Sequence, residues 1–152
     1  MCIMTDVRYA ILNDAPELSS LVQQTIRISN GQDYPIRIIE RVIDNFSIQN
    51  VCQLINSRTV WVAVRGGTLS GTASLDGNTV RMVFVLPSAQ RKGIGQCLMQ
   101  TVEKTARSRG HKILRVPASL TARGFYSKLG YFDVRELLYG DERTFVMEKP
   151  LS

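Results

Sequence analysis

Two glycines placed between a strand and a helix constrain this chain more than any other feature. Residues 80–86 are mostly apolar and β-branched, and Pro87 follows them, which predicts a strand that ends in a turn. From Ile94 to Ala106, apolar residues recur at helical spacing. Gly93 and Gly95 therefore lie where the strand gives way to the helix. Unpaired backbone N–H groups and the positive end of the helix dipole favour a bound phosphate there, and glycine lets a ligand approach the backbone closely.

Two common phosphate motifs are missing from this segment. A dinucleotide fingerprint needs a third glycine at the position of Leu98, and a P-loop needs Gly-Lys-Ser/Thr, whereas Gly95 is followed by glutamine and cysteine. The remaining pattern is Gln90-x-x-Gly93-x-Gly95 after a strand. A glycine-rich turn on a basic surface is an alternative interpretation of so short a pattern.

A second pattern follows about thirty residues later. Residues 112–116 predict a strand, and residues 119–131 predict a helix with Ser119 as N-cap and Gly130 just past its end. Ala122, Phe125 and Leu129 would form its apolar stripe. The two patterns together, in this order and spacing, resemble the two signatures of the GNAT superfamily of N-acetyltransferases.

Periodicity and turn signals along the whole chain predict an α/β protein with the order β-α-α-β-β-β-α-β-α-β-β, which matches the resemblance. Asp14 and Glu17 predict a capping box for the first helix, and the second helical segment opens at Pro35 and continues towards Leu54. The expected strands that complete the order cover residues 7–12, 59–65, 68–75, 131–138 and 142–147. We therefore expect residues 1–152 to form a single N-acetyltransferase domain, with a mixed, mostly antiparallel central sheet flanked by helices.

The resemblance implies direct transfer of an acetyl group from acetyl-CoA to an amine acceptor in a ternary complex. We expect no metal, because a single histidine and no Cys-x-x-Cys pair leave no zinc site. The resemblance also implies that the central strand diverges from its parallel neighbour, so that the backbone of Val83 and Val85 can bind the pantetheine arm. In that interpretation the N–H of Val83 polarises the thioester carbonyl. The expected cofactor-binding residues are Val83, Phe84, Val85, Gln90, Arg91, Lys92, Gly93, Ile94, Gly95, Gln96 and Ser119. Ser119 stands where many relatives carry Asn, and it could instead be only a helix cap.

Tyr126 is the expected catalytic residue. A tyrosine titrates near 10, so it is protonated at neutral pH and can give its proton to the leaving thiolate. The alternative role of Tyr126 is packing beside Phe125.

The general base is left open by the sequence. Relatives with a glutamate on the central strand carry it at the position of Thr79, and Arg81 cannot act as a base. A water chain or a carboxylate elsewhere would then remove the proton; the candidates are Asp33, Glu40, Asp133 and Glu136. Arg81 could bind a carboxylate of the acceptor, or it could be an ordinary solvated arginine.

The net charge of +6 suits coenzyme A and leaves two other classes of function open. Residues 107–112 form a basic cluster that could bind nucleic acid, although no alternation of basic and aromatic residues accompanies it. The Thr79 and Ser119 departures would also fit a coenzyme A-binding sensor or interaction module that has lost catalysis. The sequence has no apolar run of about 20 residues, the length that a membrane-spanning helix needs. The N-terminus shows no signal-peptide pattern, so we expect a cytoplasmic protein. We expect it to be a monomer or a homodimer.

Overall fold

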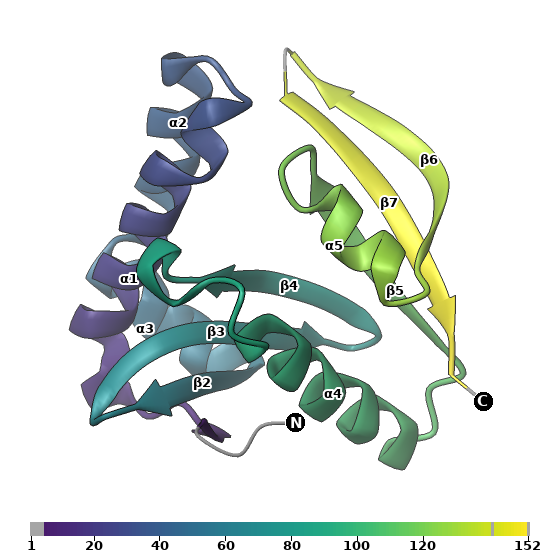
Figure 1. Cartoon of the computed structure of the whole chain (residues 1–152), viewed down its shortest axis with the longest axis horizontal. Helices are drawn as coiled ribbons and strands as arrows, with labels where there is room; N and C mark the ends of the chain where they lie inside the picture. The colour runs from purple at the N-terminus through teal and green to yellow at the C-terminus, as the bar shows by residue number, and fades with distance from the viewer. Residues whose placement is uncertain (1–4, 141, 152) are drawn as a thin grey trace.

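A computed structural model describes residues 5–140 and 142–151, which fold around one seven-stranded sheet (Figure 1). The sheet order is β1-β2-β3-β4-β5-β7-β6, and every pair of neighbours is antiparallel except β4 and β5. The strands are β1 (Asp6–Tyr9), β2 (Thr59–Arg65), β3 (Thr68–Asp76), β4 (Thr79–Val85), β5 (Ile113–Ser119), β6 (Phe132–Tyr139) and β7 (Glu142–Pro150). The helices are α1 (Ala15–Ile28), α2 (Ile36–Ile43), α3 (Ile48–Ser57), α4 (Ile94–Ser108) and α5 (Arg123–Lys128). The expected α/β class with a mixed, mostly antiparallel sheet is confirmed.

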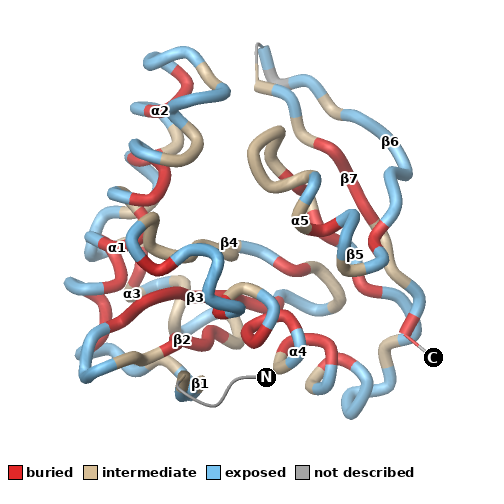
Figure 2. The backbone as a smooth tube through the Cα atoms, viewed as in Figure 1, coloured by how far each residue is buried: buried red, intermediate tan, exposed pale blue. Residues whose placement is uncertain are grey.

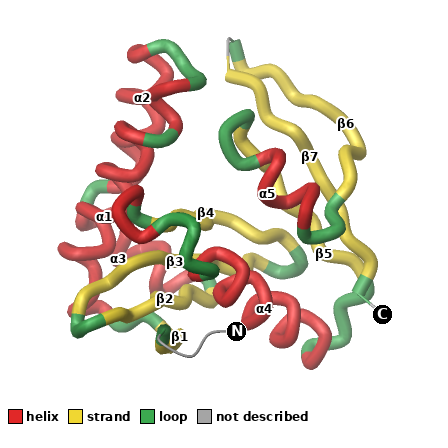
Figure 3. Tube along the Cα trace, viewed as in Figure 1, coloured by secondary structure: helices red, strands yellow, loops and turns green. Residues whose placement is uncertain are grey.

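Helices cover the sheet through two separate apolar clusters. Leu98 and Val102 of α4 pack with Leu75 of β3 in one cluster, which also includes side chains next to α5. Leu18 and Val22 of α1 belong to the other cluster, together with residues of α2, α3 and β2. β3 is buried along nearly its whole length (Figure 2), because both clusters cover it. The helices α1, α2 and α3 gather at one end of the molecule (Figure 3).

The second helical segment is interrupted, so three helices rather than two separate β1 from β2. A short turn follows Ile43, and α3 then begins at Ile48 with Ser47 as its N-cap. The Ser47 hydroxyl accepts the N–H of Asn50 at 3.2 Å, which gives α3 its own start.

The capping box predicted for α1 is wrong. Asp14 occupies the N-cap position, but its carboxylate accepts hydrogen bonds from the Ile11 N–H and the Arg8 guanidinium, both at 2.8 Å. The Arg8 contact lowers the pKa of the Asp14 carboxyl. Glu17 turns away from the helix start and accepts the N–H of Leu69 at 2.9 Å. The two carboxylates thus fasten α1 to β1 and β3 instead of capping it.

A β-bulge in β4 and an early separation of β4 from β5 shape the centre of the sheet. Thr72 pairs with Phe84 and Ser74 with Arg81, so Met82 and Val83 together oppose a single residue of β3. Met82 has a φ of 56°. β4 and β5 pair only at Thr79 and Arg115, and beyond that point they diverge (Figure 1). This is the divergence that the family resemblance implies.

The α5 segment starts later than expected. Ser119 is the last residue of β5, and the helix begins at Arg123. The Ser119 hydroxyl still accepts the N–H of Ala122 at 3.2 Å, so it stabilises the turn that leads into the helix. Gly130, with a φ of 98°, follows the last helical turn as predicted. Within the two described ranges, none of the helices combines the length and the apolar character that crossing a membrane requires.

Candidate active site

One cavity of about 440 Å³, here called the loop cavity, lies between the end of β4, the segment 87–96 and α5. It is lined by ten of the eleven residues expected to bind the cofactor: Val83, Phe84, Val85, Gln90, Arg91, Gly93, Ile94, Gly95, Gln96 and Ser119. Tyr126 also lines it. Lys92 is exposed and does not belong to the lining, so its charge lies outside the cavity wall.

The backbone of the loop turns through two left-handed residues into the start of α4. Arg91 and Gly93 both have left-handed backbones, with φ values of 65° and 79°. The first hydrogen bond of α4 runs from the N–H of Cys97 to the carbonyl of Gly93. The N–H groups of residues 94–96 therefore have no partner within the helix, and they lie at its positive end. A phosphate bound here would accept several of these hydrogen bonds at once.

The two glycines of the motif have different roles. A Cβ on Gly93 would meet nothing within 4 Å, so this glycine serves the left-handed turn. A Cβ on Gly95 would come within 3.1 Å of the Phe125 ring. Gly95 is therefore needed for the close packing of α4 against α5, a role that the sequence did not reveal.

The Gln90 side chain stabilises the loop through two hydrogen bonds. Its side-chain amide donates to the Val85 carbonyl at 3.0 Å and to the Ser29 hydroxyl at 3.1 Å. These bonds connect the loop to the end of β4 and to the end of α1. The resemblance implies that the backbone of Val85 is available to the pantetheine arm. In this structure the Val85 carbonyl accepts the hydrogen bond from Gln90.

A second cavity, here called the strand-gap cavity, opens where β4 and β5 diverge. It has a volume of about 180 Å³ and is bounded by α1, α2, the two diverging strands and the start of β7. Its lining is mostly apolar, and the charged residues in it are Arg81, Glu142 and Arg143. Thr79 lines neither cavity.

Tyr126 stands where the two cavities meet. Six residues line both of them: Asn30, Val83, Phe84, Ser119, Ala122 and Tyr126. The Tyr126 side chain is only 4% exposed, and its ring packs edge-on against Phe125 and Tyr131. Burial raises the pKa of Tyr126, so the phenol stays protonated at neutral pH. Behind it, Tyr131 donates to the buried carboxylate of Glu103 at 2.9 Å, which fixes the ring that supports Tyr126.

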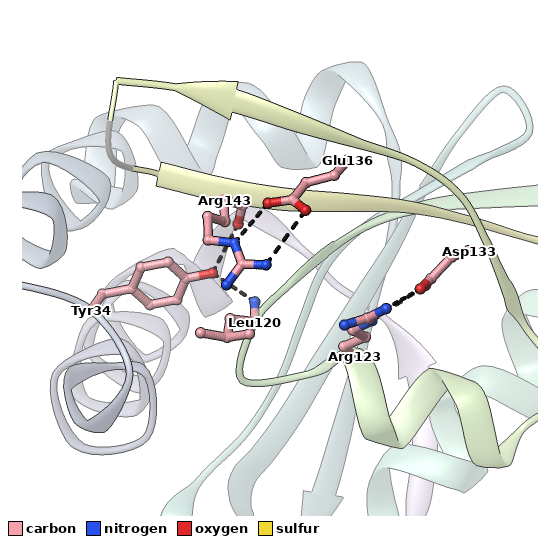
Figure 4. A network of polar contacts seen from close by, with 6 residues as sticks. All are labelled: Tyr34, Leu120, Arg123, Asp133, Glu136 and Arg143. Atoms are coloured by element: carbon pink, nitrogen blue, oxygen red, sulfur yellow. Dashed lines mark hydrogen bonds and ion pairs between the residues drawn. The ribbon is translucent and has the colours of Figure 1, made fainter.

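The connector between α1 and α2, residues 29–35, holds the turn between β5 and α5. Asn30 donates to Ser119 at 3.4 Å, and Thr121 donates to Asp33 at 2.7 Å. The Tyr34 hydroxyl accepts the N–H of Leu120 at 2.6 Å and donates to the carbonyl of Arg143 at 3.0 Å (Figure 4). Burial raises the pKa of Tyr34, which keeps this hydroxyl a donor. The connector thereby fixes the walls of both cavities.

Comparison with known proteins assigns this architecture to a family. A family model described as an acetyltransferase (GNAT) domain matches residues 32–149. The chain belongs to the GNAT family. No curated protein sequence matches the chain.

Solved structures share the GNAT fold at low sequence identity. A GCN5-related N-acetyltransferase from Rhodopseudomonas palustris, whose description adds "aminotransferase, class-II", matches with a TM-score of 0.92 and 23% identity, over 97% of this chain and 96% of its own. The PaiA N-acetyltransferase of Thermoplasma acidophilum, in complex with coenzyme A, gives 0.79 and 20% identity over 96% and 98%. N-acetylglutamate synthase of Neisseria gonorrhoeae, complexed with coenzyme A and N-acetyl-glutamate, gives 0.73 and 18% identity. The match covers 97% of this chain and 35% of that one.

The four carboxylates that the sequence offered as candidate bases lie outside the strand-gap cavity. Each has a partner: Glu40 pairs with Arg27, Asp133 with Arg123, Glu136 with Arg143, and Asp33 accepts from Thr121 (Figure 4 shows the middle two). The carboxylate in the cavity lining is Glu142, whose pairing with Arg41 is loose at 3.5 Å. Sequence reasoning missed Glu142, because only the fold brings the start of β7 opposite β4.

Proposed function

We propose that this protein transfers an acetyl group from acetyl-CoA directly to an amine, with the coenzyme in the loop cavity and the acceptor in the strand-gap cavity. The observation that carries this proposal is the meeting of the two cavities at Tyr126. One cavity ends at a phosphate-type loop and the other opens between β4 and β5. A thioester and an amine that entered from the two sides would come together at that point.

The proposed roles follow from the position of each group. The N–H groups of residues 91–96 bind the pyrophosphate, and the Arg91 charge assists them. The Val83 N–H polarises the thioester carbonyl while the amine nitrogen attacks its carbon. As the carbon–nitrogen bond forms and the carbon–sulfur bond breaks, Tyr126 gives its proton to the leaving thiolate. The amine loses a proton to solvent, directly or through Glu142, and Tyr126 recovers its own from solvent.

A coenzyme A-binding module without catalysis is the second candidate. It is favoured by Thr79 and Ser119, which stand where the resemblance expects glutamate and asparagine in many relatives. Such a module would bind coenzyme A at the same loop without releasing it from acetyl-CoA. The cytoplasmic location and the monomeric or homodimeric state stay predictions.

The two candidates are separated by a pair of measurements. Calorimetric titration with acetyl-CoA tests the loop cavity, and release of free coenzyme A in the presence of a panel of amines tests transfer. Binding with amine-dependent release supports the transferase, and binding without release for any amine supports the module. Failure to bind acetyl-CoA contradicts both.

A further inference from the structure

Arg81 is the charged group of the strand-gap cavity whose charge is least neutralised. Its Nε atom lies 3.7 Å from the Asp76 carboxylate, which is too long for a hydrogen bond, and its side chain is 43% exposed. Arg143, in contrast, is hydrogen-bonded to Glu136 at 2.6 Å. Arg81 pairs with Ser74 of β3, just before the bulge formed by Met82 and Val83. Met82 and Phe84 contact the cluster under α1 and α2, whereas Val80 and Val83 contact the cluster under α4.

A second guanidinium lies close to Arg81. Arg58, at the end of α3, is half-buried and has no ion-pair partner among the described residues. Burial lowers the pKa of Arg58, and the charge of Arg81 lowers it further. The negative charge of Asp76 acts in the opposite direction on Arg58, and it also faces Arg81. An anion at Arg81 would relieve this excess of positive charge.

Two contacts join the two sides of the strand-gap cavity. The Tyr34 hydroxyl bonds to the Arg143 carbonyl, and Arg41 of α2 pairs with Glu142 of β7. Both contacts run from the α1–α2 side to the start of β7 (Figure 4 shows the first). The strand-gap cavity, with a volume of about 180 Å³, has room for a small molecule.

We propose that the acceptor is a small amine that carries a carboxylate, which Arg81 binds while the amine points towards Tyr126. This inference rests on the proposed transferase function and adds the class of acceptor. Guanidinium and carboxylate form paired, charge-assisted hydrogen bonds, which favour a carboxylate over a neutral group of the same shape. Arg81 acts here as a specificity-determining residue.

Matched acceptors test the proposal. Release of coenzyme A is measured with phenylalanine and phenethylamine, tyrosine and tyramine, and lysine and cadaverine, with a lysine-containing peptide as a further acceptor. Rates are expressed per unprotonated amine, because loss of the carboxylate raises the pKa of the amine. We expect kcat/KM to be roughly 10- to 100-fold higher for at least one carboxylate-bearing member than for its partner, the range for a hydrogen-bonded charge.

Variants assign the preference to Arg81. Arg81→Gln should lower kcat/KM for the preferred amino acid by roughly 10-fold or more. It should lower kcat/KM for the decarboxylated partner far less. Arg81→Lys should restore part of the loss. Arg135→Gln is the matched control, because Arg135 is an exposed β6 arginine that lines neither cavity. Thermal unfolding of each variant shows whether it is folded.

The outcomes separate this inference from the proposed function. Equal or better turnover of the decarboxylated amines or of the peptide overturns it, and so does an equal loss for both members of a pair in Arg81→Gln. The inference is also overturned if acetyl-CoA binds, no amine is turned over, and no amine raises the melting temperature of the coenzyme-loaded protein. Failure of acetyl-CoA to bind contradicts the proposed function itself.

Discussion

The loop cavity and the strand-gap cavity are built in different ways from the same sheet. The loop cavity takes most of its wall from one continuous stretch, residues 83–96, and offers backbone N–H groups at the start of α4. The strand-gap cavity draws on α1, α2, β4, β5, α5 and β7, and offers side chains. A ligand bound by backbone geometry leaves a local pattern in the sequence, whereas one bound by side chains from six elements leaves none. This explains why the sequence indicated a coenzyme and not an acceptor.

The largest expected effect lies where the two cavities meet. Tyr126→Phe should lower kcat by about 10²- to 10⁴-fold and leave the Kd of acetyl-CoA nearly unchanged, because a general acid contributes that much to rate. Because burial raises the pKa of Tyr126, the wild-type rate should rise with pH as the amine loses its proton and should not fall again up to about pH 10. Wild-type kcat in Tyr126→Phe would make the residue a packing residue only. Tyr9→Phe, at an exposed tyrosine, is the control.

The next largest effect is expected at two adjacent charged residues of the loop, Arg91 and Lys92. Arg91 lines the loop cavity and Lys92 does not. Reversal of a charge close to a pyrophosphate should therefore weaken acetyl-CoA binding by about 10-fold in Arg91→Glu, and by clearly less in Lys92→Glu. Calorimetric titration at low and high salt measures both variants. Equal losses in the two variants would mean that the loop acts through its overall charge and not through the cavity wall.

Removal of one hydroxyl tests a side chain that lines the strand-gap cavity and not the loop cavity. Tyr34→Phe loses the bond from the Leu120 N–H and the bond to the Arg143 carbonyl. We expect the KM for the acceptor to rise by about 5-fold, the low end of the range for two lost hydrogen bonds, with the Kd of acetyl-CoA unchanged. Steady-state kinetics with varied acceptor measures the effect. A change in coenzyme affinity without a change in acceptor KM would show that the connector serves the loop cavity instead.

The smallest effect is expected at Thr79. This residue lines neither cavity, so Thr79→Ala should change kcat by less than about 2-fold and leave the pH–rate profile in place. Measurement of kcat between pH 6 and pH 10 compares the variant with the wild type. A large loss with intact acetyl-CoA binding would place Thr79 in a proton path and contradict our view that β4 supplies no base.

The sequence predicted those features that depend on neighbouring residues. The positions of β2 and α4, the turn at Gly130 and the loop around Gly93 all follow from local periodicity and from glycine conformation. Tyr126 and ten of the expected cofactor residues come together as a result.

Features that depend on tertiary contacts could not be read from the sequence. Met82 adopts a left-handed backbone because of the strand pairing around it, although methionine does not favour that conformation. Asp14 bonds to Arg8 instead of capping α1, since β1 lies beside it. Glu142 and Arg81 share a cavity only because β7 and β4 lie on the two sides of β5.

The central claim, that coenzyme A occupies the loop cavity and not the strand-gap cavity, is tested most directly by NMR. A titration of ¹⁵N-labelled protein with coenzyme A should shift the amide signals of residues 91–96 first, together with those of Val83 and Val85. The signals of Arg81, Glu142 and the basic segment 107–112 should move far less. Shifts centred on residues 107–112 or on the strand-gap residues, with the loop signals unmoved, would contradict the account.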